Sequence, residues 1–436
     1  MLIVDTALEK RQTEGNPVRV ALIGAGFSAS AVALNIITGV PGMKLVAIAN
    51  RTVETARKVY CGAGVESVKT VETVAQLEEA IHNGQYAVTD DAMLVCQAAG
   101  IDAIIEATGQ VEFGARVSMK AIEHGKHVVL MNAELDATIG PILKVYADRA
   151  GVVFTDTDGE EPGVAMNLYR FAKTMGYNPV AAGNIKGMLD RYRTPETQRE
   201  RAKQYGQNAQ MITSFADGTK LNMECAIMAN AMGFRAGKRG MYGPATPDVR
   251  DAAKLFPPEQ LLNGGLVDYV LGSEPGTGAW VLGYTEHPVK KFYLDLFKLG
   301  KGPFYCLYTP YHLPPLQIGS SVARAVLFHD ATVAPLGAPA CDVLAVAKRD
   351  LKAGEVMDGI GGFMAYGLID NSDVVQAEGL LPVGLSEGCR LKHDVPRDSV
   401  IRYADVALPE NRLCDKLRAE QDSYFSTAVA PRAAAR

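Results

Sequence analysis

The feature that most constrains the fold is residues 18–34, where an apolar run leads through two closely spaced glycines into a helix rich in small residues. The turn reads Gly24-x-Gly26-x-x-Ala29. Gly24 allows a tight turn, Gly26 lets a pyrophosphate approach the backbone, and Ala29 lets the helix pack close to the strand. The N–H groups at the helix start then point toward the phosphates. This context predicts a dinucleotide-binding domain of the Rossmann type. The residues expected to contact the cofactor here are Gly24, Gly26, Phe27, Ser28 and Ala29.

The end of the next predicted strand, residues 43–49, should read the ribose of the cofactor. Domains that bind NAD place Asp or Glu there, to accept a hydrogen bond from the 2′-hydroxyl. Here the neutral Asn50 is followed by Arg51, which can stack on adenine or pair with a 2′-phosphate. We therefore expect Asn50, Arg51 and Thr52 to favour NADP(H) over NAD(H). The alternative is that Arg51 is an ordinary solvated arginine at the start of a helix over 52–59.

Composition and charge exclude several classes of protein. With 436 residues, 48% of them apolar and 21% charged, the chain can bury sizeable cores and is expected to form two or three domains. A net charge of −5 with scattered Lys and Arg gives no basic stripe for nucleic acid. The longest apolar runs fall short of ~18 residues and no signal peptide is evident, so we expect a cytoplasmic protein without a membrane segment. The seven dispersed cysteines indicate neither a disulfide framework nor a zinc site.

Strands and helices alternate over the first 155 residues. Apolar runs separated by helical stretches predict a parallel sheet covered on both faces, which is a doubly wound α/β fold. The predicted strands are 18–23, 43–49, 102–107, 127–131 and 151–155. Thr108 and Gly109 follow the third strand, and Asn132 and Glu134 follow the fourth. Because ligands of such folds bind at the carboxyl edge of the sheet, these four residues are expected to line a nicotinamide pocket. Thr108 and Asn132 could instead cap the helices that follow them.

The chemistry is expected in residues 156–317, whose first polar cluster has four carboxylates within six residues, 156–161. Carboxylate oxygens are suited to a divalent cation such as Mg²⁺ or Mn²⁺, which would hold a carbonyl and a neighbouring hydroxyl. The expected metal ligands are Asp158, Glu160 and Glu161. Pro162 suits the start of a helix, which would put a carboxylate beside its positive end. The alternative is helix capping and a solvated turn.

A second cluster follows a strand predicted to end at Lys186. Gly187 would turn the chain so that Lys186, Asp190, Arg191 and Arg193 gather in one place. Arginine and lysine together suit a phosphate or carboxylate, and Lys186 could give a proton to a developing alkoxide. Pairing of these charges at the surface is the alternative.

Glu224 and His312 are two further catalytic candidates. Glu224 lies in a helix predicted to begin at Thr219, whose later turns are small and apolar; an unpaired charge there would be costly, so a site would supply its partner. A helical pair with Lys220 is the alternative. His312 follows Tyr311 in a Pro-rich turn, from which it could serve as acid, base or phosphate ligand, or have a structural role.

The segments Ala107-Thr108-Gly109 and Asn132-Ala133-Glu134 resemble those of homoserine dehydrogenase-type oxidoreductases. Residues 319–326 resemble the returning helix of that family, which implies that 318–332 complete the cofactor domain. The same resemblance implies that Asp190 and Lys186 serve the hydride step.

The Gly-rich C-terminal part, with Gly354-Glu355, Asp358-Gly-Ile-Gly-Gly and Gly384 to Cys389, resembles a SAF domain, a small β-clip module of short strands. Together with the cofactor domain it resembles the 1-deoxy-D-xylulose 5-phosphate reductoisomerase-like proteins of the homoserine dehydrogenase-related superfamily. The expected domains are an NADP-binding Rossmann domain (1–155, completed by 318–332), an α+β catalytic and dimerisation domain (156–317), and a SAF-like domain with a tail (338–436).

This resemblance implies an NADPH-dependent reductoisomerase that makes 2-C-methyl-D-erythritol 4-phosphate for isoprenoid precursors. The substrate would be a small phosphorylated sugar and the assembly a homodimer. In that mechanism Asp158, Glu161 and Glu224 are metal or base groups, while Lys186, Arg191 and His312 steady negative charge. One alternative is a plain dehydrogenase or oxidoisomerase of another small sugar, sugar acid or amino-alcohol. The other is a non-catalytic protein that senses NADPH.

Overall fold

The computed structural model describes residues 3–427, and within them the chain divides into two compact units. The first unit contains residues 3–160 together with 313–334 and 416–421. The second contains 161–312, 335–415 and 422–427. Residues 1–2 and the predicted tail 428–436 lie outside the described part. Between residues 3 and 427, no helix has the length and apolar character needed to cross a membrane.

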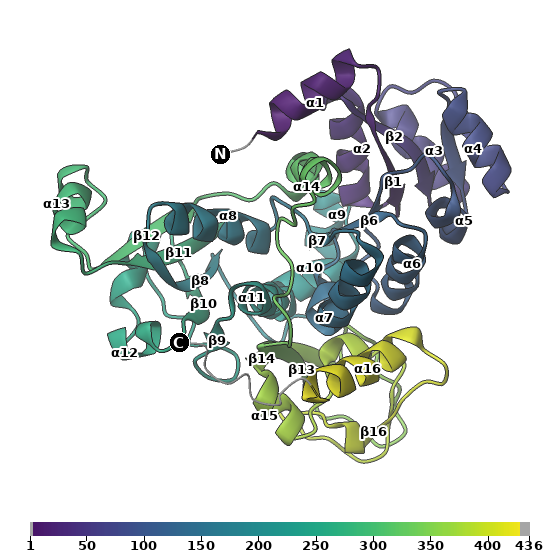
Figure 1. Ribbon diagram of the computed structural model, residues 1–436. Helices are drawn as coiled ribbons and strands as arrows, with labels where there is room; N and C mark the ends of the chain where they lie inside the picture. Colours follow the sequence, from purple (N-terminus) through teal and green to yellow (C-terminus); the bar gives the residue numbers. More distant parts are fainter. Residues whose placement is uncertain (1–2, 428–436) are drawn as a thin grey trace. The chain divides into compact units, whose positions relative to one another are not determined.

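The first unit is built on a parallel sheet whose strands lie in the order β3-β4-β2-β1-β5-β6-β7, with helices on both faces (Figure 1). Val18–Ile23 (β1) pairs on one side with Met43–Ala49 (β2) and on the other with Ala103–Glu106 (β5). Strand order reverses at β1, as in doubly wound folds, so the predicted Rossmann-type sheet is confirmed. Two short strands, Val68–Thr70 (β3) and Tyr86–Thr89 (β4), were not expected from the sequence.

The other elements of this unit are His127–Leu130 (β6), Phe154–Asp156 (β7), Val4–Thr13 (α1), Phe27–Gly39 (α2), Val53–Gly62 (α3), Val74–His82 (α4), Ala92–Gln97 (α5), Val111–Glu123 (α6), Ala133–Ala150 (α7) and Pro314–Phe328 (α14).

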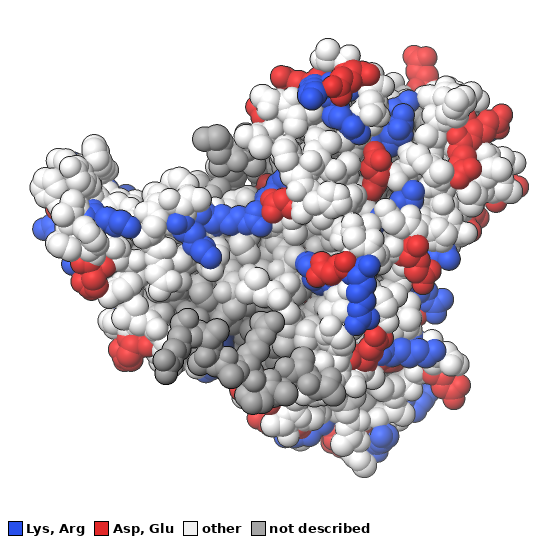
Figure 2. Space-filling model, in the orientation of Figure 1, with Lys and Arg blue, Asp and Glu red and all other residues white. Residues whose placement is uncertain are grey.

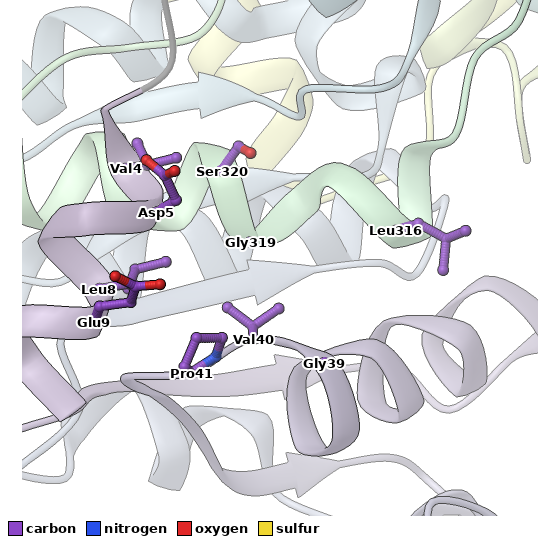
Figure 3. A pocket seen from close by; sticks show the side chains of 10 residues that line it. All are labelled: Val4, Asp5, Leu8, Glu9, Gly39, Val40, Pro41, Leu316, Gly319 and Ser320. Atoms are coloured by element: carbon purple, nitrogen blue, oxygen red, sulfur yellow. The ribbon is translucent and has the colours of Figure 1, made fainter.

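Helix α14 packs against α2 in the first unit. The Asn35 side-chain amide donates to the Leu316 carbonyl at 3.0 Å, and a Cβ on Gly319 would lie 3.4 Å from Val40. Between α14, the end of α2 and α1 lies a groove of about 200 Å³, with the carboxylates of Asp5 and Glu9 on one wall (Figure 3). Ligand pockets are usually larger, about 300 Å³ or more. The groove also lies at the opposite end of α2 from the glycine turn, so it is not the nucleotide site.

The second unit contains a mixed sheet in the order β12-β11-β8-β10-β9 (Figure 1). Asn178–Lys186 (β8) ends at Lys186, as predicted, and pairs in parallel with Leu266–Leu271 (β10) and antiparallel with Ala279–Tyr284 (β11). Helices Glu161–Thr174 (α8) and Thr219–Met232 (α11) pack on this sheet, and every residue of α11 is buried. Burial on all sides explains why α11 is so rich in alanine and methionine.

The other elements of the second unit before residue 313 are Arg235–Ala236 (β9), Phe304–Thr309 (β12), Arg199–Tyr205 (α9), Ala209–Ala216 (α10), Pro258–Leu262 (α12), Pro288–Leu296 (α13) and the 3-10 helix Val249–Lys254 (η1). The C-terminal elements are Cys341–Ala347 (β13), Ala365–Asn371 (β14), Arg390–Leu391 (β15), Val406–Ala407 (β16), Ser372–Ala377 (α15), Leu413–Thr427 (α16) and the 3-10 helices Val383–Leu385 (η2) and Tyr403–Asp405 (η3).

Residues 335–415 share a compact unit with 161–312, whereas the sequence predicted a separate third domain. The reason lies in buried polar side chains of α11. Thr219 Oγ1 accepts a hydrogen bond from the backbone N–H of Gly367 at 2.9 Å, and Asn222 Oδ1 accepts one from Ile369 at 2.9 Å. These bonds fasten β14 to α11. The short strands and turns of this region agree with a β-clip in kind, but the SAF assignment stays a prediction.

Candidate functional site

The glycine turn after β1 forms an open cradle at the start of α2. Gly24 has φ +108°, and a Cβ on it would lie 3.0 Å from the Ala107 carbonyl oxygen. Gly26 is the N-cap of α2, no side chain caps the helix, and nothing lies within 4 Å of a Cβ placed there. The first turn carries no acidic residue, and Phe27 is exposed. The helix N–H groups are therefore available to an anion, and the cradle fits the pyrophosphate of a dinucleotide.

The other two residues of the motif differ in exposure. Ser28 is half-buried beside the cradle. Ala29 is buried in the core beneath α2, so its contribution is the close packing of the helix on the sheet. Contact between the cofactor and Phe27 or Ser28 stays a prediction.

The loop between β2 and α3 holds the residues predicted to read the ribose. The Asn50 side-chain amide donates to the Thr52 carbonyl at 2.9 Å, so it shapes the loop itself. Thr52 is the N-cap of α3 but makes no side-chain capping bond. Arg51 is exposed, and among the described residues its guanidinium has no hydrogen-bond or ion-pair partner. Arg51 is thus the group of this loop whose charge is available to a 2′-phosphate.

A buried carboxylate at the end of β5, Glu106, joins two residues predicted to line the nicotinamide pocket. Its Oε1 accepts hydrogen bonds from the Thr108 backbone N–H, at 3.0 Å, and from the Thr108 hydroxyl. Its Oε2 accepts from the Asn132 side-chain amide at 2.6 Å. Asn132 Oδ1 also caps α7 by accepting from the Leu135 N–H at 3.1 Å, as the structural alternative expected. Gly109 is half-buried nearby in sequence, and its site role stays a prediction.

Glu106 is fully buried and its hydrogen-bond donors are neutral. Burial raises the pKa of its carboxyl to about 7, the bonds from Thr108 and Asn132 oppose the rise, and the charge of buried Glu134 adds to it. In the sheet Glu106 pairs with Ile23, directly before the glycine turn. A carboxyl that titrates near neutral pH therefore lies at the switch point of the sheet, where doubly wound folds bind ligands. Sequence reasoning passed over it as the end of a strand.

The acidic segment 156–161 is buried, so the alternative of a solvated turn is wrong. Asp158 Oδ1 accepts from the Gly159 N–H at 3.0 Å, and the Asp158 N–H donates to the Ser321 hydroxyl at 2.6 Å. Burial, together with the charge of Glu160, raises the pKa of Asp136 on α7 to about 7. Within residues 3–427 no group of three or more His, Cys, Asp or Glu side chains is arranged to hold a metal ion. A metal site at Asp158, Glu160 and Glu161 stays a prediction.

In the second unit, His312 after β12 approaches Glu161 at the start of α8. His312 Nδ1 lies 2.8 Å from the Thr277 hydroxyl oxygen and 3.5 Å from Glu161 Oε1. The His312 side chain is 31% exposed and that of Glu161 12%, so the imidazole is accessible while the carboxylate is largely covered. A histidine oriented by a hydroxyl and a carboxylate is an arrangement suited to general acid–base chemistry. Of the predicted catalytic residues, the structure brings these two together.

Glu224 also has a defined partner. The Asn184 side-chain amide, on β8, donates to Glu224 Oε2 at 2.6 Å, and both residues are buried. Burial raises the pKa of the neighbouring Cys225 thiol well above its ordinary value, and the charges of Glu224, Asp268 and Glu161 add to the rise.

Two members of the second predicted cluster, Asp190 and Arg193, form an ion pair with 3.0 Å between Oδ2 and Nε, as the alternative of charge pairing at the surface expected. The Arg191 guanidinium lies over the Tyr366 ring at 5.8 Å. Lys186 ends β8 two residues after Asn184, and since side chains alternate along a strand it lies on the same face as Asn184. Lys186 therefore shares a face of β8 with Asn184, which is the hydrogen-bond partner of Glu224.

Two family models match separate parts of the chain. Residues 18–130 match a model described as "Oxidoreductase family, NAD-binding Rossmann fold", and residues 159–318 match "Oxidoreductase DRL, catalytic domain". None of the curated proteins matches.

Solved structures include loose matches. A probable dehydrogenase from Thermotoga maritima is 13% identical, with a TM-score of 0.41 over 70% of this chain and 85% of that one. A putative myo-inositol dehydrogenase from Sinorhizobium meliloti 1021 is 11% identical, with a TM-score of 0.42 over 72% and 90%. The myo-inositol dehydrogenase of Lactobacillus casei, solved with NAD(H) and myo-inositol, is 14% identical, with a TM-score of 0.38 over 68% and 75%. With TM-scores this low, these likenesses assign no function.

The family matches correct the resemblance inferred from the sequence. The sequence was expected to resemble reductoisomerase-like proteins related to homoserine dehydrogenase. Residues 18–130 match instead the NAD-binding oxidoreductase family, and residues 159–318 match the DRL catalytic domain. Both descriptions are of oxidoreductases. The chain is therefore an oxidoreductase with a Rossmann-type domain for a nicotinamide cofactor.

Proposed function

We propose that this oxidoreductase is an NADP(H)-dependent dehydrogenase that interconverts a hydroxyl and a carbonyl group on a small sugar or sugar acid. The observation that carries the proposal is His312 held between Thr277 and Glu161, in a segment that matches an oxidoreductase catalytic domain. Dehydrogenation needs a group that takes the hydroxyl proton as hydride leaves the carbon. A carboxylate-supported imidazole is suited to that role.

The first unit provides residues that fit the cofactor. Gly24 and Gly26 leave room for the pyrophosphate at the uncapped start of α2, and exposed Arg51 would pair with a 2′-phosphate. Glu106 fixes Thr108 and Asn132 at the switch point, on the side where a nicotinamide ring would lie. When bound, the nicotinamide supplies the hydride acceptor or donor.

In the proposed mechanism His312 handles the proton. With a hydrogen on Nδ1, the ring donates toward Thr277 and Glu161, and Nε2 is left as the basic atom. Nε2 accepts the proton of the substrate hydroxyl, and the carboxylate of Glu161 stabilises the imidazolium that forms. In the reverse direction the same atom returns the proton to the developing alkoxide.

The remaining groups would orient the substrate. The Asn184 amide fixes Glu224 Oε2, so this carboxylate is held rigidly and is suited to accept a hydrogen bond from a sugar hydroxyl. Lys186, on the same face of β8 as Asn184, is the cation proposed to bind a phosphate or carboxylate of the substrate.

The test compares two histidine variants of the full-length protein. The assay follows reduction of NADP⁺ with a panel of polyols, sugar acids and sugar phosphates, each with and without a chelator. His312→Gln should lower kcat about 100-fold or more and leave the dissociation constant of NADP⁺ unchanged, because general acid–base groups contribute about that much. His393→Gln, at an exposed position in the same unit, should change neither. A His312→Gln enzyme with full turnover would contradict the assignment.

A further inference from the structure

Residues 285–303 form a finger that leaves the sheet after β11 and returns to it at β12 (Figure 1). The finger contains α13, and none of the side chains of α13 is buried. Phe292 is 63% exposed and Phe297 76%. The large apolar side chains that the finger exposes are Val289, Phe292, Tyr293, Leu296, Phe297 and Leu299. A contiguous apolar surface of this kind costs free energy in water, and it marks a site of contact with a protein or a membrane.

The exposed apolar side chains gather on one side of α13. They recur at three- and four-residue spacing, and the charged residues of the helix lie outside this set of positions. The rings of Tyr293 and Phe297 stack with centroids 6.3 Å apart, and Phe292 meets Tyr293 edge-on at 5.5 Å. An amphipathic helix with aromatic and leucine side chains on one side and lysines on another is suited to lie in the plane of a membrane interface.

Backbone groups at both ends of α13 find partners within the finger. The helix begins with a proline, which has no N–H, and His287 Nδ1 accepts a hydrogen bond from the Lys290 N–H at 3.4 Å. At the other end Lys298 has φ +69°, and the Leu299 N–H donates to the Leu294 carbonyl at 2.9 Å. Unpaired backbone groups are costly where water is scarce. These partners therefore lower the cost of moving the finger into the headgroup region of a bilayer.

The charge of the finger is opposite to that of an anionic membrane. Its four lysines outnumber its two carboxylates, Glu286 and Asp295, in a chain whose net charge is −5. Lys298 and Lys301 are exposed, and within residues 3–427 their ammonium groups have no hydrogen-bond or ion-pair partner. Figure 2 shows a mostly pale lobe at the place of α13, with blue atoms along its lower margin. Lysines beside an apolar surface can bury their stems and still bring the ammonium to lipid phosphates.

We propose that the finger docks the protein on the surface of a membrane that contains anionic phospholipids. The apolar side of α13 would lie among the upper parts of the acyl chains, with Lys298 and Lys301 at the phosphates. With nine residues α13 is too short to span a bilayer, which takes about 20, so it would lie on the surface. A second copy of this chain fits less well as the occupant, because it would bring the same excess of lysines to the contact. The proposal does not depend on the proposed dehydrogenase activity.

The test measures co-sedimentation of the full-length protein with vesicles of phosphatidylcholine, with and without phosphatidylserine. The wild-type chain should bind the mixed vesicles about tenfold or more tighter than phosphatidylcholine alone, because each lysine near an anionic surface contributes about fivefold in affinity. Phe292→Ala combined with Phe297→Ala should weaken binding to the mixed vesicles about 100-fold, because two rings no longer enter the interface. Phe363→Ala, at an exposed aromatic of the same unit outside the finger, is the matched control and should bind as wild type does.

The lysines are tested separately from the rings. Lys298→Gln combined with Lys301→Gln should weaken binding to the mixed vesicles about tenfold or more and leave binding to phosphatidylcholine unchanged. These two are chosen because Lys290 has a structural contact, donating to the Gly176 carbonyl at 2.8 Å. Because the substituted side chains are exposed, all the variants are expected to fold, with the urea unfolding midpoint of wild type.

A tryptophan placed in the finger reports insertion directly. The chain has one tryptophan, Trp280, which is fully buried, so the added indole supplies the change in fluorescence. Lipids brominated on the acyl chains should quench the fluorescence of Phe297→Trp and leave that of Phe363→Trp unchanged. A wild-type chain that stays in solution with both kinds of vesicle, or binding that the double phenylalanine variant retains, would overturn the proposal. A dimer in solution that the same variant breaks, without binding to vesicles, would also overturn it and assign the finger to a second copy.

Discussion

Two buried carboxylates, one in each unit, are held in opposite ways. Asp217 in the second unit has the ammonium of Lys348 at 2.9 Å, and the Lys348 side chain is itself 2% exposed. Glu106 in the first unit is as deeply buried but accepts only from neutral donors. Burial raises the pKa of both carboxyls, and only at Asp217 does a nearby cation oppose the rise.

The difference separates groups that hold the chain together from groups that can act on a ligand. Lys348 also donates to the carbonyls of Arg193 and Gly362, at 2.8 Å each, so it ties three stretches of the chain to Asp217. The charge of Lys348 therefore has a structural role. Among residues 3–427 no cation contacts Glu106, so its protonation changes near neutral pH, beside the cradle proposed for the cofactor.

The largest effect is expected from Lys348→Met. Removing the ammonium leaves Asp217 buried without a cation and two carbonyls without their donor, and breaking a buried pair in this way costs about 3–5 kcal/mol. Urea unfolding at neutral pH should show that loss in the free energy of unfolding. Lys352→Met removes the exposed pair with Asp394 and should leave the unfolding midpoint unchanged, as the matched control. Equal midpoints for the two variants would contradict a structural role for Lys348.

The next effect concerns the pH dependence of stability through Glu106. Its folded pKa of about 7 lies above the ordinary value of 4.5. Below pH 4.5 the Glu106 carboxyl is protonated in both the folded and the unfolded chain, so its raised pKa does not change the free energy of unfolding. As pH rises, the unfolded chain ionises first, so the folded state loses stability until about pH 7, by about 3 kcal/mol.

Glu106→Gln removes this loss. The free energy of unfolding of the variant, relative to wild type, should therefore rise between about pH 4.5 and pH 7 and then level off. A mismatch between the new amide and the Asn132 amide adds a constant offset, so the slope alone reports the titration. Asp136 titrates in both proteins and cancels in the difference. Parallel curves would show that Glu106 is ionised throughout.

The sequence predicts the glycine turn of the cradle but not the buried carboxylate beside it. Gly24 and Gly26 could be interpreted because their roles depend on local backbone geometry within one strand, turn and helix. Glu106 could not, because its burial depends on β1 beside it and on α6, whose Gly114 lies against its carboxylate, and because Asn132 reaches it from another strand end. A carboxylate closing an apolar strand was the available signal.

In the second unit, too, the sequence identified candidate residues but not their partners, which lie farther away along the chain. The sequence identified Glu161, Glu224 and His312 as candidates, but not that Glu161 faces His312 or that Asn184 holds Glu224. These partners come from different elements and meet only through the packing of α8 and α11 on the sheet. Likewise the four carboxylates of 156–161 were visible in the sequence, but their burial was not.

The two glycines of the turn differ in the same way, because Gly24 is expected to serve the fold and Gly26 the cofactor. The expected effects are of intermediate size. Gly24→Ala would force a Cβ within 3.0 Å of the Ala107 carbonyl oxygen at φ +108° and should cost about 2 kcal/mol of stability. Gly26→Ala meets nothing within 4 Å and has φ −79°, so it should fold normally. Its methyl would instead crowd the pyrophosphate, and NADP⁺ affinity measured by calorimetry should fall. Loss of stability in both variants would mean that Gly26 is scaffold as well.

The smallest effect is expected at Arg51, which differs from its neighbour Arg57 as Glu106 differs from Asp217. Arg57 is anchored to the Val68 carbonyl at 2.7 Å and to the Thr70 hydroxyl at 2.6 Å, whereas Arg51 makes no such contact within the described part of the chain. If Arg51 binds the 2′-phosphate, Arg51→Ala should weaken NADP⁺ about tenfold, as expected for one exposed charge-assisted contact, and leave NAD⁺ unchanged. Arg57→Ala should lower the unfolding midpoint without altering the ratio of the two dissociation constants. An unchanged ratio in Arg51→Ala would remove the basis for NADP(H) preference and favour NAD(H), since Asn50 is committed to the loop.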